Sequence, residues 1–138
     1  MVRQRGRTQA CSAAEARSRR SQARKFLEVA EIAASEGEQD PEYASVSASL
    51  AVLAGIAAAD AACCKALAER SRSQDHHDAE QLLSKVAGGA GAAKQLRELI
   101  NLKDAAHYGF FDVSRAELTK ALRRAKALLR FADEVQGR

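Results

Sequence analysis

The sequence contains no tryptophan, one proline and eight glycines in 138 residues, and aromatic residues make up 4% of it. Proline and glycine interrupt helices most strongly, whereas alanine, which accounts for 31 residues, favours them most. These proportions predict an all-α chain. The shortage of large apolar side chains predicts a thin core whose helices approach closely. Because a thin core often gains burial at a subunit interface, we expect a homodimer.

The chain is also poor in cysteine and in features that direct a protein to or across a membrane. Of its three cysteines, Cys63 and Cys64 are adjacent on a predicted helix, so their side chains diverge. We therefore expect no disulfide framework and a cytoplasmic location. The arginine-rich start lacks the apolar stretch of a signal peptide. Residues 44–67 are apolar, but Asp60, several serines and many alanines favour a buried helix of a soluble protein over a membrane span.

Charge is distributed unevenly along the chain. Residues 1–25 hold eight basic residues and one acidic residue, whereas the rest hold 14 basic and 17 acidic residues. We therefore divide the chain into a basic, flexible N-terminal arm, 1–16, and a folded helical domain, 17–136. Basic segments of this kind attract nucleic-acid backbones, although a solvated tail has the same composition. The candidate nucleic-acid-binding residues are Arg3, Arg5, Arg7, Arg17, Arg19 and Arg20.

Hydrophobic periodicity predicts five helices. They cover residues 13–35, 41–69, from 73 or 75 to before 88, 92–106, and from 114 onward; Gly88-Gly89-Ala90-Gly91 is expected to be a flexible stop. Asp40-Pro41 is a typical helix start, and Ser114 with Glu117 forms a capping box. We expect an up-and-down bundle of four to five helices. In the second helix, positions 46, 50, 53, 57, 60, 64 and 67 form a heptad seam, so this helix is expected to lie at the centre.

Asp60 is the one acid on that seam. Burying an isolated carboxylate costs several kcal/mol, so a partner should meet it. The candidates are His76, His77, His107, Lys103 or an arginine from another helix. The carboxylate could orient a catalytic histidine, or it could be a structural polar anchor of the bundle.

Two stretches carry groups suited to phosphate chemistry. Arg70 and Arg72 precede His76 and His77 within residues 70–78, and Lys103 precedes His107 and Tyr108 at the end of the fourth helix. A cationic side chain can hold a phosphate while a nearby imidazole moves protons. The same residues also suit an ordinary helix start and a helix end. Neighbouring histidines point about 100° apart on a helix, so we expect no metal site and no cofactor.

Three stretches resemble, in the same order, the HEPN family of small helical domains. They are Gly55-Ile56-Ala57-Ala58-Ala59-Asp60-Ala61-Ala62-Cys63-Cys64-Lys65-Ala66-Leu67, Asp75-His76-His77-Asp78-Ala79-Glu80-Gln81-Leu82-Leu83, and Leu102-Lys103-Asp104-Ala105-Ala106-His107-Tyr108. The resemblance covers about residues 17–136. It implies a dimeric bundle of four to five helices. Many members are metal-independent ribonucleases of toxin–antitoxin or defence systems, often paired with a nucleotidyltransferase.

The family signature is an arginine followed after four to six residues by a histidine, usually before the last helix. Here Lys103 and His107 stand before the last helix, but only three residues separate them. The pairs Arg70/His76 and Arg72/His77 have the four-to-six-residue spacing of the signature, but they precede the third helix. The leading interpretation is therefore an interaction or nucleotide/RNA-binding module with an eroded catalytic signature. The alternatives are an active endoribonuclease and a structural bundle that binds a protein partner.

Overall fold

The computed structural model describes residues 8–36, 40–72, 76–107 and 113–138, with residues 103–107 described by their backbone only. This part of the chain forms five helices and one two-stranded ribbon. In chain order they are β1 (Thr8–Ala10), α2 (Ala13–Glu36), α3 (Pro41–Leu67), β2 (Glu69–Ser71), α4 (His76–Ser84), α5 (Gly89–His107) and α6 (Arg115–Gln136). The all-α class and the helical bundle predicted from composition are confirmed.

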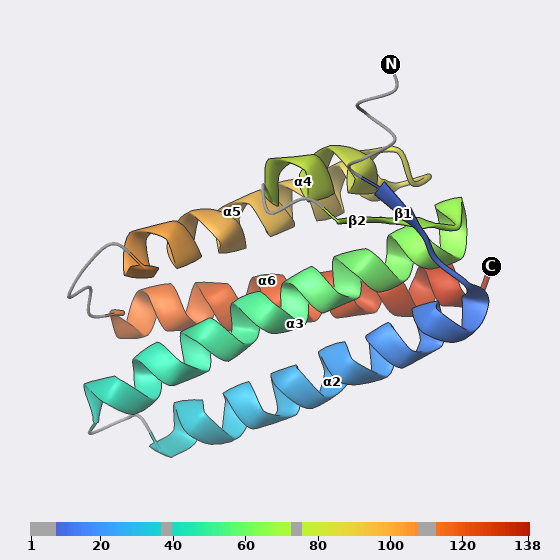
Figure 1. Cartoon of the computed structure of the whole chain (residues 1–138). Coiled ribbons are helices and arrows are strands. Elements are labelled where there is room, and N and C mark those ends of the chain that lie inside the picture. The colour runs from blue at the N-terminus through green and yellow to red at the C-terminus, as the bar shows by residue number, and fades with distance from the viewer. Residues whose placement is uncertain (1–7, 37–39, 73–75, 108–112) are drawn as a thin grey trace.

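The long helix α3 lies at the centre of the bundle (Figure 1). It packs against α2 and α6 along much of its length and also contacts α4 and α5. Its neighbours α2 and α5 run in the opposite direction, whereas α6 runs the same way. By length and composition α3 could cross a membrane, but 72% of its most apolar window is buried inside the bundle, as in the core helix of a soluble protein.

The sequence signals at two helix starts act as predicted. The Asp40 side chain accepts a hydrogen bond from the Glu42 N–H at 2.9 Å, and Pro41 occupies the first helical position. Ser114 accepts from the Glu117 N–H at 3.1 Å while the Glu117 carboxylate accepts from the Ser114 N–H at 3.0 Å. Each cap satisfies backbone donors that have no partner inside the helix.

Small residues on α3 let its neighbours approach closely. Gly55 shows this best, since a Cβ atom at that position would lie 2.5 Å from Leu99 Cδ1 and 3.1 Å from Leu128 Cδ1. Leu99 belongs to α5 and Leu128 to α6, and both are almost fully buried. The glycine therefore brings three helices together at one point of the core, as expected for a bundle with few large side chains.

The predicted glycine-rich stop after α4 is shorter than expected. Gly88 has a positive φ of 79°, which makes the turn, but α5 already begins at Gly89. A Cβ atom on Gly89 would lie 2.2 Å from the Leu83 carbonyl oxygen. Gly89 is thus needed where the first turn of α5 passes the end of α4, and the prediction that 88–91 is a flexible break was wrong.

The end of α3 and the start of the chain also differ from the prediction. The helix ends at Leu67, where Ala68 adopts the left-handed conformation, and the chain continues into β2. There β2 pairs antiparallel with β1, with Thr8 opposite Ser71 and Ala10 opposite Glu69. Residues 8–16, part of the predicted flexible arm, form β1, the link Cys11-Ser12 and the first turn of α2.

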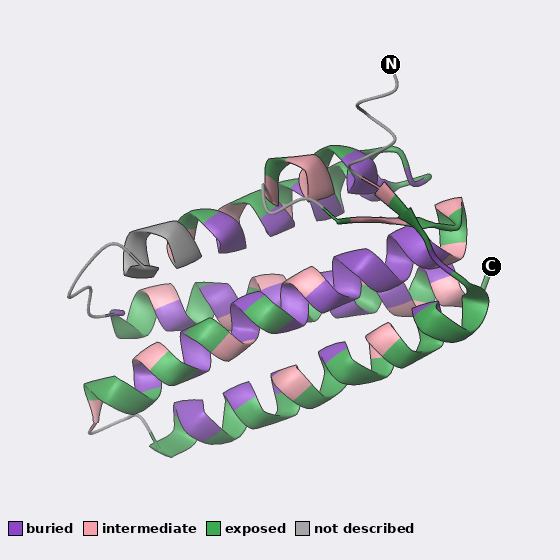
Figure 2. Ribbon diagram, viewed as in Figure 1, coloured by how far each residue is buried: buried purple, intermediate pink, exposed green. Residues whose placement is uncertain are grey.

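The predicted heptad seam of α3 is buried over only half of its length. Ala57, Asp60 and Cys64 are buried, but Val46 and Leu53 are exposed. Figure 2 shows the same trend, with exposed segments on the half of α3 that follows its N-terminus and buried segments toward its C-terminus. The helix is therefore central, as predicted, but it is not enclosed on all sides.

Candidate functional site

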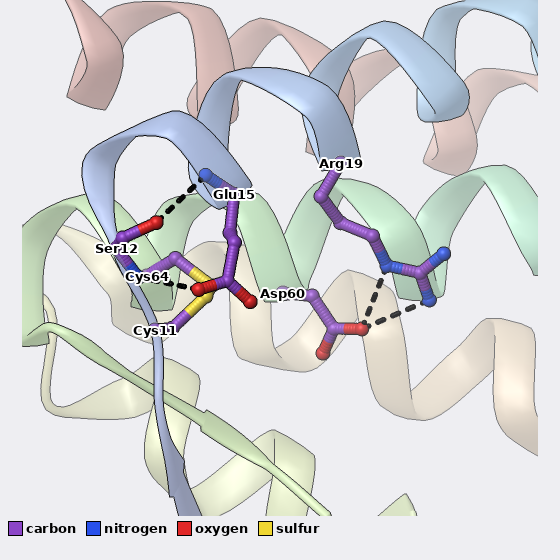
Figure 3. Close-up of a disulfide and its surroundings, with 6 residues drawn as sticks. All are labelled: Cys11, Ser12, Glu15, Arg19, Asp60 and Cys64. Atoms are coloured by element: carbon purple, nitrogen blue, oxygen red, sulfur yellow. Dashed lines mark hydrogen bonds and ion pairs between the residues drawn. A yellow bond between two sulfur atoms is a disulfide. The ribbon is translucent and has the colours of Figure 1, made fainter.

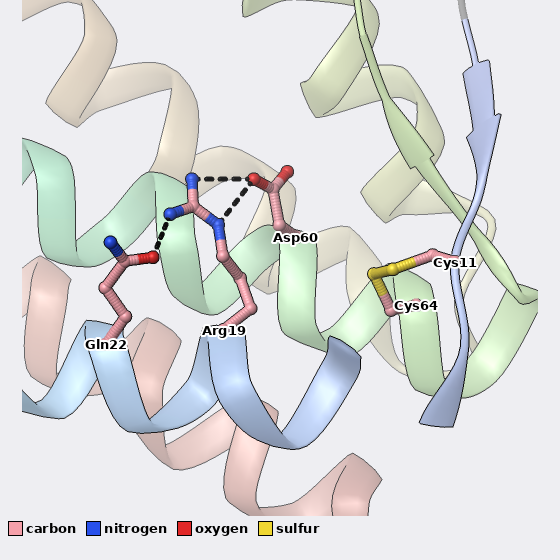
Figure 4. A network of polar contacts seen from close by, with 5 residues as sticks. All are labelled: Cys11, Arg19, Gln22, Asp60 and Cys64. Carbon is pink, nitrogen blue, oxygen red and sulfur yellow. Dashed lines mark hydrogen bonds and ion pairs between the residues drawn. A yellow bond between two sulfur atoms is a disulfide. The ribbon is translucent and has the colours of Figure 1, made fainter. Parts of the chain in front are cut away.

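Asp60 is paired with an arginine from another helix, which was one of the partners expected from the sequence. Its Oδ2 atom accepts hydrogen bonds from Arg19 Nε at 3.1 Å and from Arg19 Nη2 at 3.0 Å (Figure 3). Arg19 lies on α2 and Asp60 on α3. The third guanidinium nitrogen of Arg19 donates to Gln22 Oε1 (Figure 4). All three nitrogens of Arg19 are thus engaged within the protein.

Burial raises the pKa of Asp60 above its ordinary value, and the neighbouring cations oppose this shift. Arg19 opposes it most, through its charge and its hydrogen bonds, followed by Arg70 and His76. Arg70 belongs to β2, and His76 is the first residue of α4. Side chains from α2, β2 and α4 therefore act electrostatically on one carboxylate of α3.

A surface pocket of about 380 Å³ opens beside this ion pair. Its lining comes from the start of α2, the end of α3 and β2: Cys11, Glu15, Ser18, Arg19, Gln22, Cys64 and Arg70. Glu15 is fixed by a capping box, because its carboxylate accepts from the Ser12 N–H at 3.2 Å and its own N–H donates to Ser12 Oγ at 3.1 Å (Figure 3). The pocket therefore has one fixed acid and two guanidinium groups in its wall.

Arg70 is the second cation in the lining of this pocket. It is half-buried, and within the described part of the chain no hydrogen bond or ion pair engages its guanidinium. Its strand is held in place, since β2 is paired with β1 and follows directly on α3. A guanidinium that faces a pocket without a partner can bind a carboxylate or phosphate in a bidentate manner.

A disulfide closes one side of the pocket, and this corrects the prediction from the cysteine pattern. Cys11 and Cys64 are bonded, with their Cα atoms 5.1 Å apart (Figures 3 and 4). The backbone reinforces this link, because the Cys11 N–H donates to the Ala68 carbonyl at 2.9 Å. The sequence predicted no disulfide framework, because Cys63 and Cys64 diverge on one helix, whereas the partner of Cys64 lies 53 residues away in sequence.

The remaining cysteine is not a reactive group. Cys63 is free and 3% exposed. Burial, and then the charge of Asp60, raise the pKa of its thiol to about 12. Because the thiolate is the nucleophilic form, this thiol is inert at neutral pH.

The other predicted site residues do not all join the pocket. His77 is exposed, and its Nδ1 atom lies 3.5 Å from Glu80 Oε2, while Arg72 is exposed on the chain after β2. The structure thus favours the pair Arg70/His76 over Arg72/His77 as neighbours of Asp60. The second predicted group, Lys103, His107 and Tyr108, lies outside the residues whose side chains are described.

The candidate nucleic-acid-binding arginines fall into three groups. Arg17 is exposed on α2. Arg19 is paired with Asp60, and Arg20 lies 3.5 Å from Asp133 of α6, so the charges of both are partly neutralised within the protein. Arg3, Arg5 and Arg7 lie outside the described residues. Thr8, the first described residue, pairs with Ser71 next to Arg70.

Some residues of this site were not found by sequence reasoning. Gln22 and Glu15 carry no motif of their own, although Ser12 followed by Glu15 is a capping-box pattern that marks the start of α2. In the part of the chain that the structure describes, no three His, Cys, Asp or Glu side chains gather in a way that could hold a metal ion.

Comparisons with protein-family models, with curated proteins and with solved structures found no match for this chain.

Proposed function

We propose that this protein is a HEPN-like helical bundle that binds RNA through its phosphate groups, with the pocket beside Asp60 as the binding site. One observation carries the proposal: Arg70 and Arg19 line the same pocket, and His76 lies within electrostatic range of Asp60, as both arginines do. Sites for single-stranded nucleic acid include a positively charged groove that follows the phosphate backbone, and Arg70 and Arg19 supply positive charge of this kind.

The different roles of Arg19 and Arg70 support this site. Arg19 neutralises the buried Asp60, so its role is structural. Arg70 retains its charge for a ligand because Asp60 is already paired. The His76 imidazole, at the N-terminus of α4, adds a group that can donate a hydrogen bond to a phosphate oxygen, and the positive end of the helix dipole acts in the same direction.

The basic N-terminal residues support binding of a polymer over binding of a single nucleotide. They precede β1 in the sequence, and the partner strand of β1 carries Arg70. A basic segment attached at that edge would contact phosphates beyond the pocket, and each phosphate neutralised adds to the salt dependence of binding. Of the stretches that carry the family resemblance, the first falls in α3, and residues 76–83 of the second fall in α4. The nucleotidyltransferase-type partner, the toxin–antitoxin or defence setting and the ribonuclease activity stay predictions.

The proposal predicts that Arg70→Ala weakens binding of a fluorescently labelled single-stranded RNA by about tenfold and makes it less dependent on salt. Loss of one charge-assisted hydrogen bond has an effect of this size, and loss of one phosphate contact on a single strand lowers the slope of log K against log salt by about 0.7. Fluorescence anisotropy at several salt concentrations measures both quantities on the full chain.

Arg123→Ala serves as the matched control, since Arg123 is an exposed arginine of α6, away from the pocket lining. It removes the same charge and should change affinity less than twofold. Equal loss in the two variants would mean that binding follows net charge alone. No RNA binding by the unaltered protein at low salt would contradict the proposed function outright.

A further inference from the structure

The Cys11–Cys64 disulfide is part of the wall of the pocket. Both cysteines belong to the pocket lining, together with Arg70 and Glu15. Elsewhere they are enclosed, since only 5% of Cys11 and 2% of Cys64 is exposed. The pocket is therefore a route by which a small molecule reaches the bond. Exchange between a disulfide and a thiol depends on this access and on the charges around the sulfur atoms.

The reagent that this pocket admits is small. A volume of about 380 Å³ lies in the range of sites for small molecules. A thiol of a folded protein would need to dock directly on the bond, and the enclosure of both cysteines prevents such contact. The structure thus favours a thiol of low molecular mass over a protein dithiol.

The charges of the lining indicate which groups this thiol carries. Asp60 already pairs with Arg19, so Arg70 and Glu15 are the remaining charged side chains of the lining. A guanidinium binds a carboxylate, and a carboxylate binds an ammonium group. The Glu15 carboxylate is held in place by the Ser12 N–H at 3.2 Å. One cation and one anion beside a disulfide match a thiol that has both a carboxylate and an ammonium group, as free cysteine has.

The two sulfur atoms lie at opposite ends of helix dipoles. Cys11 immediately precedes Ser12, whose hydroxyl caps α2 by accepting from the Glu15 N–H at 3.1 Å. Cys64 lies in the last turn of α3, which ends at Leu67. The positive N-terminal end of α2 stabilises a thiolate at Cys11, whereas the negative C-terminal end of α3 opposes one at Cys64. Cys11 is therefore the better leaving group, and Cys64 is the sulfur that is attacked.

We infer that the pocket is a thiol–disulfide exchange site at which a small thiol with a carboxylate and an ammonium group reduces the Cys11–Cys64 bond. The thiolate of the reagent attacks Cys64 Sγ and forms a mixed disulfide, while Cys11 leaves with the electron pair of the broken S–S bond and takes up a proton. A second thiolate attacks the sulfur of the bound reagent and releases Cys64, which is also protonated. Two thiols are thus oxidised to one small disulfide, and the protein disulfide is reduced to two thiols.

Reduction rates of the full chain with four thiols test the inference without RNA, so the result is independent of the proposed function. The thiols are free cysteine, 3-mercaptopropionate, which lacks the ammonium group, cysteamine, which lacks the carboxylate, and 2-mercaptoethanol, which lacks both. Acid quenching, alkylation of the denatured chain and mass spectrometry follow the reaction, in which the labelled cysteines rise from one to three. Each rate constant is divided by that of 2-mercaptoethanol with the same variant, which cancels changes in the accessibility of the bond.

Two variants that each remove one charge should change these relative rates selectively. Arg70→Gln should lower the relative rate about tenfold for free cysteine and 3-mercaptopropionate, but not for cysteamine, because it removes one charge-assisted hydrogen bond to the carboxylate. Glu15→Gln keeps the capping side chain and should lower the relative rate about threefold for free cysteine and cysteamine only. Arg123→Ala, at an exposed position of α6, is the control and should leave every relative rate unchanged.

Relative rates that are the same for the unaltered chain and Arg70→Gln would overturn the inference. So would a reduction rate that stops rising with thiol concentration and increases steeply with urea, because the bond then opens only when the chain unfolds. Relative rates unchanged in Glu15→Gln alone would overturn the requirement for an ammonium group. Capture of the mixed disulfide on Cys11 instead of Cys64 would overturn the direction of attack.

Discussion

Reduction of the Cys11–Cys64 disulfide is expected to lower the free energy of unfolding by about 4 kcal/mol. The bond closes a loop with a sequence separation of 53 residues, so its reduction gives the unfolded chain much more conformational freedom. The bond also joins the start of α2 to the end of α3, next to the candidate site. Urea unfolding with and without dithiothreitol measures the loss.

Two cysteine variants separate the bond from the side chains that form it. Cys63→Ala keeps the disulfide and should show the same response to dithiothreitol as the unaltered chain, because Cys63 is the free thiol. Cys11→Ala/Cys64→Ala should be less stable from the outset and indifferent to the reductant. Identical unfolding midpoints for the oxidised and reduced unaltered chain would show that the bond does not hold the fold.

Substitution of Arg19 by alanine is expected to lower the free energy of unfolding by about 2 kcal/mol at neutral pH. Breaking an exposed ion pair changes the free energy of unfolding little, whereas breaking a fully buried one lowers it strongly. The Arg19–Asp60 pair lies between these cases, since the two side chains are 30% and 9% exposed. Without Arg19 the buried carboxylate keeps no direct partner among the described contacts. Urea unfolding at neutral pH measures the change, with Arg24→Ala as the control. The Arg24–Asp133 pair is more exposed, at 47% and 38%, so its loss should change stability by less than about 1 kcal/mol.

The pH dependence of Arg19→Ala gives a second readout. Because burial raises the pKa of Asp60, the stability that this group contributes is greatest when it is protonated and falls as the pH rises through the raised pKa. Removal of Arg19 raises that pKa further, so the variant should lose stability at neutral pH and recover most of it at about pH 4, near the ordinary value of 3.8. Asp60→Asn in the Arg19→Ala background should remove the pH dependence. A loss equal at both pH values would contradict an ionised pair.

Local signals predicted the helices well. The Asp40-Pro41 start and the Ser114–Glu117 capping box depend on residues within one turn of each other, so the sequence contains all that their geometry needs. The predicted helix boundaries were less accurate where they depend on contacts with residues outside the helix. Gly89 was read as a helix breaker, yet its position is decided by how closely the Leu83 carbonyl passes it.

Long-range pairings escaped sequence analysis because nothing local specifies them. The strand residues Thr8–Ala10 and Glu69–Ser71 are short and largely polar, and their pairing is aligned by the disulfide and by the end of α3. The cytoplasmic location was predicted partly from the expected absence of a disulfide. Since disulfides persist in oxidising environments, the bond removes that argument, and the location stays a prediction.

The candidate site was predictable in part. An acid on an apolar seam must have a partner, which is why an arginine from another helix was among the candidates for Asp60. The identity of Arg19 depends on the register of α2 against α3, which the sequence does not reveal. The heptad pattern of α3 was likewise readable, but periodicity alone does not tell which part of the seam other helices of the chain cover.

The most direct test of the RNA site is a ¹H–¹⁵N NMR titration of the isotopically labelled full chain with a short single-stranded RNA. The largest shifts should occur at Arg70, at its neighbours in β2, at Arg19 and at His76, and they should saturate together with one dissociation constant. Shifts confined to α6, with β2 and the start of α4 unchanged, would contradict this binding site.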